Sequence, residues 1–399
     1  MFYRPPLDIR VSVDVGCKSH QVAVGLSTGE VIDEFSINHQ PDGFRTFFAK
    51  LEQLEQQYQC PVRVAMEGYN GYARPLDSMV LARGWQLNNI NNLKLARFKE
   101  IFPGAAKTDV IDARRGLELF QLMDHLPTAK DVLQVVAEPP RENQMLKRLS
   151  RRRRRLVNER VRVVNNLQAD LQAVCPSLLA LTGDAGNIWF LQLLTHTDDL
   201  RKLSRLHLKT LRKIPGIGAA YASRVQQWQK QAQFSAEAEW VGEMIQQDAA
   251  RILELHSQIK ALEAKMAAAA TQSNIAGLLA TLPGFGPICT AELAGEIGHE
   301  ARFFKEASLA LYLGMATLDN SSGQYRGSKI PRQVNSRAKA AMMIAVDRHR
   351  KQVPASQRYY EKKRAEGKGH NQAVRALGRH LCRVIFKMLK ERRAYMPPN

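Results

Sequence analysis

The stretch from Lys107 to Arg115 holds two carboxylates, Asp109 and Asp112, just inside a segment predicted to be a helix. Residues three apart share one helical face, so the two side chains can point at the same spot. Two acids at one spot repel each other unless a cation lies between them, and a hard divalent ion bound through carboxylate oxygens is the usual solution. Taken alone, the pair is better explained by two solvated aspartates on an exposed helix face. The interpretation therefore depends on the elements that would surround them.

Those elements are predicted from hydrophobic periodicity. Alternating apolar residues predict strands at 9–15, 21–26 and 30–37, which form an antiparallel meander, and a fourth strand at 62–67. Helical spacing predicts helices at 41–58, 72–82 and 93–102, with a short strand at 85–90 and a helix that carries the acidic stretch to about residue 123.

This order of elements matches the RNase H-like fold, a mixed sheet with helices on its faces. That fold places one acid on the first strand, one at the end of the fourth strand and the others on a late helix. Asp14, Glu67, Asp109 and Asp112 stand at those places. Four carboxylates in register indicate a metal centre for Mg²⁺ or Mn²⁺. Two such ions about 4 Å apart stabilise the attacking and leaving oxygens of a phosphodiester cleavage.

The composition indicates a polyanionic partner. The 399 residues include 58 Lys and Arg against 38 Asp and Glu, a net charge of +20, and nucleic acid is the partner that fits best. The five cysteines are widely spaced and odd in number, which predicts reduced thiols in the cytoplasm. The sequence predicts neither a signal peptide nor an apolar run long enough to span a membrane.

A long amphipathic helix is predicted from Arg141 to about Val174. It carries a run of basic residues that includes Arg148, Arg151, Arg152, Arg153, Arg154 and Arg155. A solvated charged face is the plain explanation. Five consecutive arginines repel one another, however, so contact with a phosphate backbone is favoured.

A heptad pattern follows, with Ile245, Ile252, Ile259 and Met266 spaced by seven and Leu255 and Leu262 between them. It predicts a coiled coil, formed either with another subunit or with the chain's own arginine-rich helix. Two turns, Ile214-Pro215-Gly216-Ile217-Gly218 and Leu282-Pro283-Gly284-Phe285-Gly286, resemble helix-hairpin-helix turns. Such turns hold a phosphate or simply join two helices, and the sequence leaves both explanations open.

A loop rich in small and polar residues contains Ser321, Ser322 and Gly323, with Arg326, Lys329 and Arg332 after it. A serine in a mobile loop beside basic residues is a candidate nucleophile for a phosphate. From spacing alone an ordinary turn is the better explanation.

Together these segments resemble the DEDD-type transposases of bacterial insertion sequences, a family that includes the Piv-like DNA invertases. The resemblance covers most of the chain from Ile9 to about Leu389. It is carried by Val11-Ser12-Val13-Asp14, Met66-Glu67-Gly68, Lys107 to Ala113, Leu282 to Pro287, Glu296-Ile297-Gly298, Phe303, Tyr312-Leu313-Gly314 and Ser322-Gly323.

The resemblance implies a RuvC-like N-terminal domain at 1–130, a basic helical and coiled-coil linker at 131–275 and a mainly α-helical transposase domain at 276–399. It implies that Ser322 attacks a DNA phosphate, with Ser321 as the less favoured neighbour, and that the four acids hold Mg²⁺. Lys107, Arg326, Lys329, Arg332 and the arginine run would contact nucleic acid. Some members use a guide RNA encoded in their own element, and the two halves of the site can come from different subunits of a dimer or tetramer.

Two departures from the family pattern affect the expected contacts. Glu67-Gly68-Tyr69-Asn70-Gly71 replaces the usual Glu-Ala-Thr-Gly, and Arg332-Gln333-Val334-Asn335 stands where Lys-x-Gly-Asn is usual. The expected function is a site-specific DNA recombinase that cuts and rejoins donor and target DNA. The alternatives are a junction-resolvase-like nuclease that uses water as the nucleophile, and a non-catalytic nucleic-acid scaffold.

Overall fold

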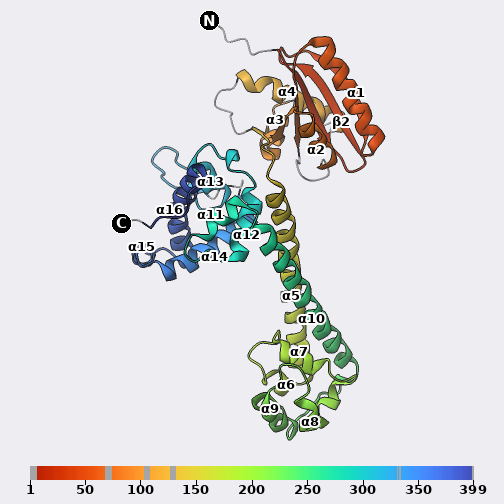
Figure 1. Ribbon diagram of the computed structural model, residues 1–399, viewed down its shortest axis with the longest axis vertical. Helices are drawn as coiled ribbons and strands as arrows, with labels where there is room; N and C mark the ends of the chain where they lie inside the picture. The colour runs from red at the N-terminus through yellow and green to blue at the C-terminus, as the bar shows by residue number, and fades with distance from the viewer. Residues whose placement is uncertain are drawn as a thin grey trace. The chain divides into compact units, whose positions relative to one another are not determined.

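The computed structural model describes residues 7–67, 74–102, 108–125, 132–329, 331 and 334–397. The chain divides into two compact units, Met1–Glu138 and Pro139–Asn399, and each is described by itself (Figure 1). The predicted sites Lys107 and Arg332 lie outside the described residues, as does the segment that follows Glu67.

The first unit is a mixed α/β structure around a six-stranded sheet of order β3-β2-β1-β4-β5-β6. The strands are β1 (Ile9–Val15), β2 (Ser19–Leu26), β3 (Val31–Asn38), β4 (Val62–Glu67), β5 (Gln86–Ile90) and β6 (Leu133–Val135). The first three form an antiparallel meander, β4 and β5 join in parallel, and β6 returns antiparallel. In its described residues this unit has four α-helices: α1 (Pro41–Tyr58), α2 (Arg74–Ala82), α3 (Asn92–Lys99) and α4 (Asp109–Leu122), the last followed by η1 (Met123–His125).

Alternation along β1 separates the two faces of this sheet. Ile9, Val11 and Val13 join the phenylalanines of α1 in one hydrophobic cluster. The residues between them, Arg10 and Ser12, are also buried, because α4 covers the other face. Asp14 is the next residue in that second series, so the strand directs its carboxylate toward the α4 side.

The second unit is mostly helical. Its two longest helices, α5 (Arg141–Val174) and α10 (Ala238–Ala270), pack along each other. Arg153 pairs with Glu263 and Glu159 with Arg251, so the partner number falls as the α5 number rises and the helices run antiparallel. The heptad residues Leu255 and Ile259 pack with Leu156 of α5. The sequence left two partners open for the heptad residues, another subunit or the chain's own arginine-rich helix. In the structure they pack against the arginine-rich helix.

A compact cluster that we call the tip module, residues 175–237, joins α5 to α10 at the far end of the pair (Figure 1). It contains α6 (Pro176–Leu179), α7 (Ile188–Leu194), η2 (Leu200–Arg205), α8 (Leu208–Leu211) and α9 (Ala219–Gln229). These short helices share a hydrophobic core with the adjoining ends of α5 and α10.

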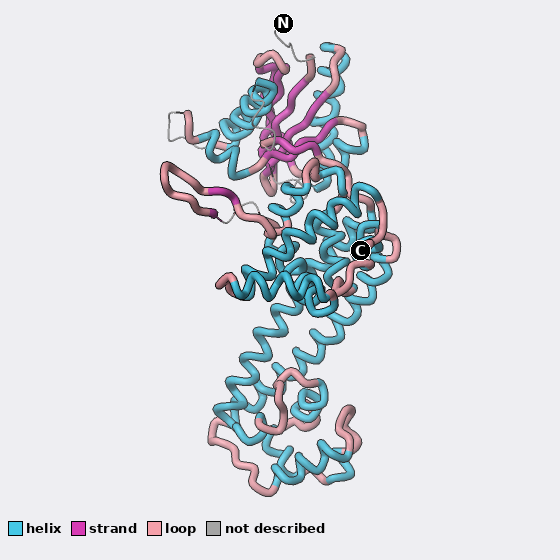
Figure 2. The backbone as a smooth tube through the Cα atoms, turned by 90° about the vertical axis from the view of Figure 1, so that its left-hand side faces the viewer, coloured by secondary structure: helices cyan, strands magenta, loops and turns pink. Residues whose placement is uncertain are grey.

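The remaining helices form a third core with the first turns of α5. They are α11 (Asn274–Ala280), α12 (Pro287–Ile297), η3 (Glu300–Arg302), α13 (Glu306–Tyr312), α14 (Ser336–Gln352), α15 (Pro354–Ala365) and α16 (His370–Glu391). Between α13 and α14 a hairpin of β7 (Leu318–Asp319) and β8 (Ser328–Lys329) stands out from the helices of this unit (Figure 2).

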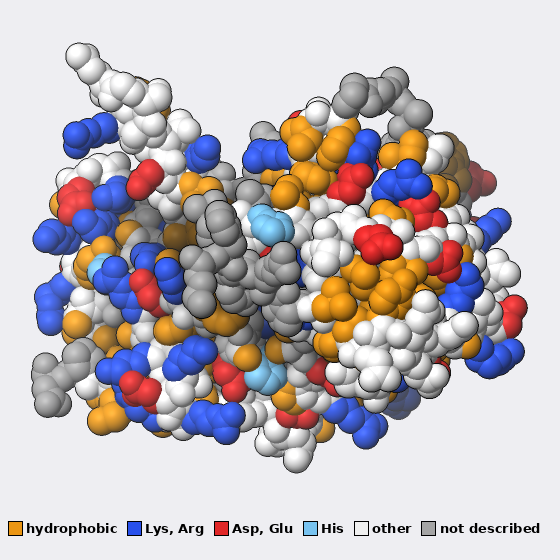
Figure 3. All heavy atoms as spheres, turned by 90° about the horizontal axis from the view of Figure 1, so that it is seen from above, with side chains coloured by type: hydrophobic (Ala, Val, Ile, Leu, Met, Phe, Trp, Pro, Cys, Tyr) orange, Lys and Arg blue, Asp and Glu red, His pale blue; other side chains and the backbone are white. Residues whose placement is uncertain are grey.

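The prediction of an α/β N-terminal part followed by a mainly helical part is confirmed. The strands at 9–15 and 62–67 and the helices at 41–58 and 141–174 begin and end where the sequence predicted. No helix in the described part of the chain is long and apolar enough to cross a membrane. Lys and Arg side chains are spread over the face drawn in Figure 3, in keeping with the net charge of +20.

Candidate active site

The first two acids lie at neighbouring strand ends. β1 and β4 pair in parallel with Val13 opposite Met66, so Asp14 and Glu67 are the next residues along each strand. Because paired residues of parallel strands point to the same face, both carboxylates are directed to the side of the sheet that α4 covers. Asp14 and Glu67 are each partly buried.

The other two acids open α4. Thr108 caps this helix by accepting a hydrogen bond from the backbone N–H of Ile111 (3.3 Å). Asp109 and Asp112 occupy its first turn, where the positive end of the helix dipole favours negative charge. Asp112 is partly buried and Asp109 is exposed.

Three contacts from β1 hold α4 in place. Arg10, which is buried, donates from Nη1 to the carbonyl oxygens of Phe120 (2.6 Å) and Gln121 (3.2 Å) at the far end of the helix. Gly116 lies against Ser12 so closely that a Cβ at this position would stand 2.2 Å from the serine Oγ. Asp112 is one turn before Gly116, and Asp14 is two residues beyond Ser12. The close contact therefore brings these two acids together.

The electrostatic state of Asp14 shows this coupling. Its pKa is raised to about 6 by burial, then by the negative charge of Asp112, and further by Asp109 and Glu67. The structure thus brings all four predicted acids within electrostatic reach of one another.

A cation that the sequence did not single out already contacts this group. Lys99, the last residue of α3, places Nζ 3.0 Å from Oδ1 of Asp112 and acts to lower the Asp14 pKa. In the part of the chain that the structure describes, no group of three or more His, Cys, Asp or Glu side chains is arranged to hold a metal ion. The four carboxylates are the oxygen donors that Mg²⁺ prefers. Because Lys99 is paired with Asp112, the four carboxylates are not arranged to coordinate a metal ion.

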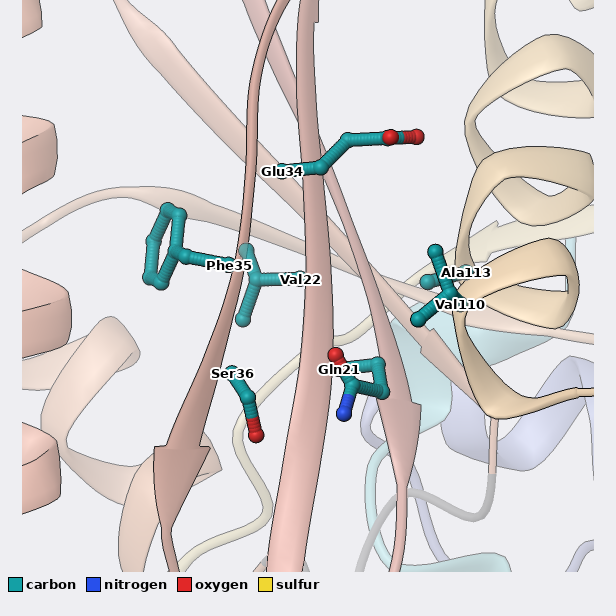
Figure 4. A pocket seen from close by; sticks show the side chains of 7 residues that line it. All are labelled: Gln21, Val22, Glu34, Phe35, Ser36, Val110 and Ala113. Atoms are coloured by element: carbon teal, nitrogen blue, oxygen red, sulfur yellow. The ribbon is translucent and has the colours of Figure 1, made fainter.

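A shallow hollow lies beside the start of α4, between the helix and strands β2 and β3 (Figure 4). Glu34 on β3 and Val110 and Ala113 on α4 face into it, and none of the four acids lines it. Glu34 is held by a bidentate pair with Arg114. This hollow therefore does not extend the acidic site.

Ser322 lies in the second unit, at the end of the β7–β8 hairpin. It exchanges two backbone hydrogen bonds with Tyr325, of 3.1 and 3.0 Å, which close a tight turn. Gly323 supplies the positive φ of 56° that this turn requires. Ser322, Arg326 and Lys329 are all exposed. The Ser322 hydroxyl makes no hydrogen bond with any residue that the structure describes.

The base of this hairpin is fixed by a partly buried network that the sequence did not predict. Asn335 donates to Oε2 of Glu296 (2.7 Å) and to the Tyr312 hydroxyl (2.7 Å), and its backbone N–H donates to the Tyr312 carbonyl (3.0 Å). Tyr312 and Asn335 flank the serine loop, so both of its ends are tied to Glu296. Burial acts to raise the pKa of Glu296, but Arg151 and Asn335 hold it below its ordinary value.

The arginine run on α5 is largely explained by such pairs. Arg151 and Arg154 form bidentate pairs with Glu296 and Glu292, two buried acids of α12, and Arg153 pairs with Glu263. The premise that consecutive arginines require a polyanion is therefore wrong for these three. Arg148, Arg152 and Arg155 are exposed and form no ion pair with a described residue.

The comparisons with known proteins agree with this architecture. A family model described as a DEDD-type transposase matches residues 11–176, and a model of the IS116/IS110/IS902 transposase family matches residues 276–361. The chain belongs to the IS110 family of DEDD transposases. Membership identifies it as an insertion-element transposase, an enzyme that acts on DNA, and suggests a divalent metal ion.

Relatives similar over the whole length come from other insertion elements. The 44.8 kDa protein of IS116 from Streptomyces clavuligerus is 24% identical, and the alignment covers 98% of this chain and 96% of the relative. The 43.6 kDa protein of IS110 from Streptomyces coelicolor is 26% identical with the same coverage. A putative transposase of Sinorhizobium fredii is 28% identical over 51% of this chain and 54% of its own length.

Proposed function

We propose that this IS110-family transposase is a site-specific recombinase in which Ser322 is the nucleophile and Asp14, Glu67, Asp109 and Asp112 hold Mg²⁺. The observation that carries the proposal is the Asp14 carboxyl group, whose pKa is raised by burial and by the three other acids. Mutual repulsion among four carboxylates favours a bound cation, which supports a metal site at this position. The strand order of the first unit supports an RNase H-like fold for this domain.

In the proposed reaction the Ser322 Oγ attacks a DNA phosphorus, the phosphodiester bond to one deoxyribose oxygen breaks, and a phosphoserine link forms. Rejoining reverses these bonds with a second DNA end, so no ATP is needed. Bound Mg²⁺ would stabilise the negative charge on the attacking and leaving oxygens. The exposed Arg326 and Lys329 would hold the DNA backbone beside the serine.

We also propose that the chain has three domains, at residues 1–130, 131–275 and 276–399. In this proposal the middle domain is a coiled-coil linker that binds part of a guide RNA. The protein acts as a dimer or tetramer. Arg148, Arg152 and Arg155 are the linker arginines best suited to this contact, because they are exposed and without ion pairs in the described structure. Lys107 and Arg332 remain proposed contacts.

Trapping on nicked DNA tests the nucleophile. Wild-type protein and Ser321→Ala are expected to become covalently joined to DNA, and Ser322→Ala is not. A covalent complex formed by Ser322→Ala would overturn the serine assignment. Loss of cleavage without loss of DNA binding is expected for Asp109→Asn with Asp112→Asn.

The second candidate is a metal-dependent nuclease of the junction-resolvase kind. It is favoured by one observation: all four acids belong to the first unit, which has its own core, and Ser322 belongs to the second. Water would then be the nucleophile. Full cleavage of DNA by Ser322→Ala, with no covalent complex in wild-type protein, would select this candidate.

A further inference from the structure

The tip module contains a long stretch that carries basic residues and no acidic residue. From Leu200 to Ala236 there is no Asp or Glu, and the basic residues are Arg201, Lys202, Arg205, Lys209, Arg212, Lys213, Arg224 and Lys230. Arg201 and Lys202 pair with Asp199 and Asp198 just outside this stretch. The other six are exposed and form no ion pair or side-chain hydrogen bond with a described residue.

The basic side chains without an ion pair lie on the outside of a helical hairpin. Leu211, Ile214 and Ile217 point into the module's core, which leaves the intervening Arg212 and Lys213 in solvent. On α9, Ala222 and Val225 are buried and Arg224 is exposed. The same alternation that builds the core therefore builds a basic surface.

An aromatic ring is part of this surface. Tyr221, 37% exposed, stacks on Trp189 with ring centroids 4.4 Å apart and an angle of 20° between the rings. The turn at Gly216 lies against the same tryptophan, since a Cβ at Gly216 would stand 3.1 Å from the Trp189 Cβ. Tyr221 thus joins the basic side chains around the hairpin turn.

The second hairpin of the chain shows that this exposure is not a property of the turn itself. Gly216 and Gly284 have the same backbone, with φ of 82° and 83°, and each turn closes with a 3.1 Å hydrogen bond. At Gly284 a Cβ would stand 2.3 Å from the backbone nitrogen of His349, so that turn is packed against α14. The turn at Gly216 is open to solvent.

We propose that the tip module binds the phosphate backbone of duplex DNA through Lys209, Arg212, Lys213 and Arg224, with Tyr221 as a further contact beside the hairpin turn. One family model ends at residue 176 and the other begins at residue 276. Most of this module lies between them, so the family match assigns no role to it. The proposal rests on the proposed function only in taking DNA as the substrate. Backbone contacts of this kind position DNA without reading its sequence.

Fluorescence anisotropy of the full-length protein on a labelled DNA duplex, in chelator, tests the proposal without any cleavage. The tip variant combines Lys209→Ala, Arg212→Ala, Lys213→Ala and Arg224→Ala. Its affinity is expected to fall at least about tenfold, and the slope of log affinity against log salt to shrink by about 3.6, because each of the four lost phosphate contacts contributes about 0.9. Its thermal stability is expected to match wild type.

The matched control removes four exposed lysines from elsewhere in the second unit, as Lys265→Ala, Lys305→Ala, Lys362→Ala and Lys390→Ala. The control is expected to lower affinity less than threefold. Equal losses in both variants would show a net-charge effect and overturn the proposal, as would an unchanged salt slope in the tip variant. A loss confined to an RNA duplex of the same sequence would overturn the assignment to DNA.

The outcome is independent of the chemistry proposed above. If Ser322→Ala also formed a covalent complex, the serine assignment would fail while the binding result stood. A tip variant that bound DNA normally would overturn this inference and leave the recombinase proposal intact.

Discussion

Asp14 is the residue at which the acidic site can be tested without substrate. Its folded-state pKa of about 6 lies above the unfolded value of 3.8, because of burial and the neighbouring acids, so the folded state binds more protons between these values. Stability therefore falls as pH rises from about 4 to about 6 and stays lower above it. In chelator, Asp14→Asn is expected to be more stable than wild type at pH 7.5, by about 1 kcal/mol after allowance for partial exposure.

Thermal unfolding at several pH values measures this difference. The advantage of Asp14→Asn is expected to shrink as pH falls from about 6 to about 4, because in this interval wild-type Asp14 is protonated in the folded state and ionised in the unfolded state. An advantage that does not depend on pH would mean that the asparagine acts by packing and not by charge.

Lys99 gives a second test at this scale. Its ammonium group lies 3.0 Å from Asp112 and competes with any divalent cation for that carboxylate. Replacing it as Lys99→Met is expected to tighten Mn²⁺ binding about fivefold, which corresponds to about 1 kcal/mol for a partly exposed ion pair. Calorimetric titration measures the affinity, with Arg97→Met on the same helix as the control. Weaker binding would show that Lys99 orients Asp112 for the metal.

At the scale of the elements, the contact between Gly116 of α4 and Ser12 of β1 sets the distance between two of the acids. Gly116→Ala improves helix propensity by about 1 kcal/mol but places a Cβ 2.2 Å from the Ser12 Oγ. The clash is expected to prevail, costing about 1–3 kcal/mol of stability and weakening Mn²⁺ binding.

A second substitution at the same contact is expected to relieve the clash caused by Gly116→Ala. Ser12→Ala removes the Oγ and leaves the Ser12 Cβ at 3.4 Å, which Gly116→Ala can accept. The double variant is expected to recover both stability and metal affinity. Failure of the rescue, with Ser12→Ala alone harmless, would contradict this account of how α4 is docked.

Asn335 makes a matching link in the second unit, at the base of the serine loop. It caps α14 and also holds Glu296 and Tyr312. Asn335→Ser keeps the cap but loses the link, whereas Asn335→Ala loses both and is expected to cost about 1 kcal/mol more in stability. Both variants are expected to lower covalent trapping by Ser322 at equal DNA affinity. Trapping that falls only in Asn335→Ala would assign the effect to the cap alone.

The sequence predicted strongly periodic elements well because their apolar residues recur at a fixed spacing along one face. The strands that carry Asp14 and Glu67 and the helix at 141–174 are examples. The tip module was seen only as a turn, because helices such as α8, of four residues, are too short to show a period. The pairing of Lys99 with Asp112, and of Asn335 with Glu296, depends on tertiary contacts that no local pattern records.

At the scale of the whole molecule, the basic residues behind the net charge of +20 are of two kinds, those paired with buried acids and those exposed without a partner in the described structure. On α5, Arg151 and Arg154 are bound to the buried acids Glu296 and Glu292 of α12, whereas Arg148, Arg152 and Arg155 are exposed without an ion pair in the described structure. The first kind stabilises the fold and the second is available to nucleic acid. Neighbouring positions on one helix thus serve different ends, which a count of charges cannot separate.

Two sets of substitutions separate these roles. Arg148→Ala with Arg152→Ala and Arg155→Ala is expected to weaken nucleic-acid binding about tenfold and to reduce the salt slope by about 3, with little change in melting temperature. Arg151→Ala with Arg154→Ala is expected to cost at least about 3 kcal/mol of stability, since it leaves two buried carboxylates unpaired. Anisotropy titrations and thermal unfolding of both variants measure the two effects. The division into structural and nucleic-acid-binding arginines would be contradicted if the first set of substitutions lowered stability. It would also be contradicted if the second set weakened nucleic-acid binding in a protein that still folds. In either case the effect would depend on how many arginines are removed and not on which acids they contact.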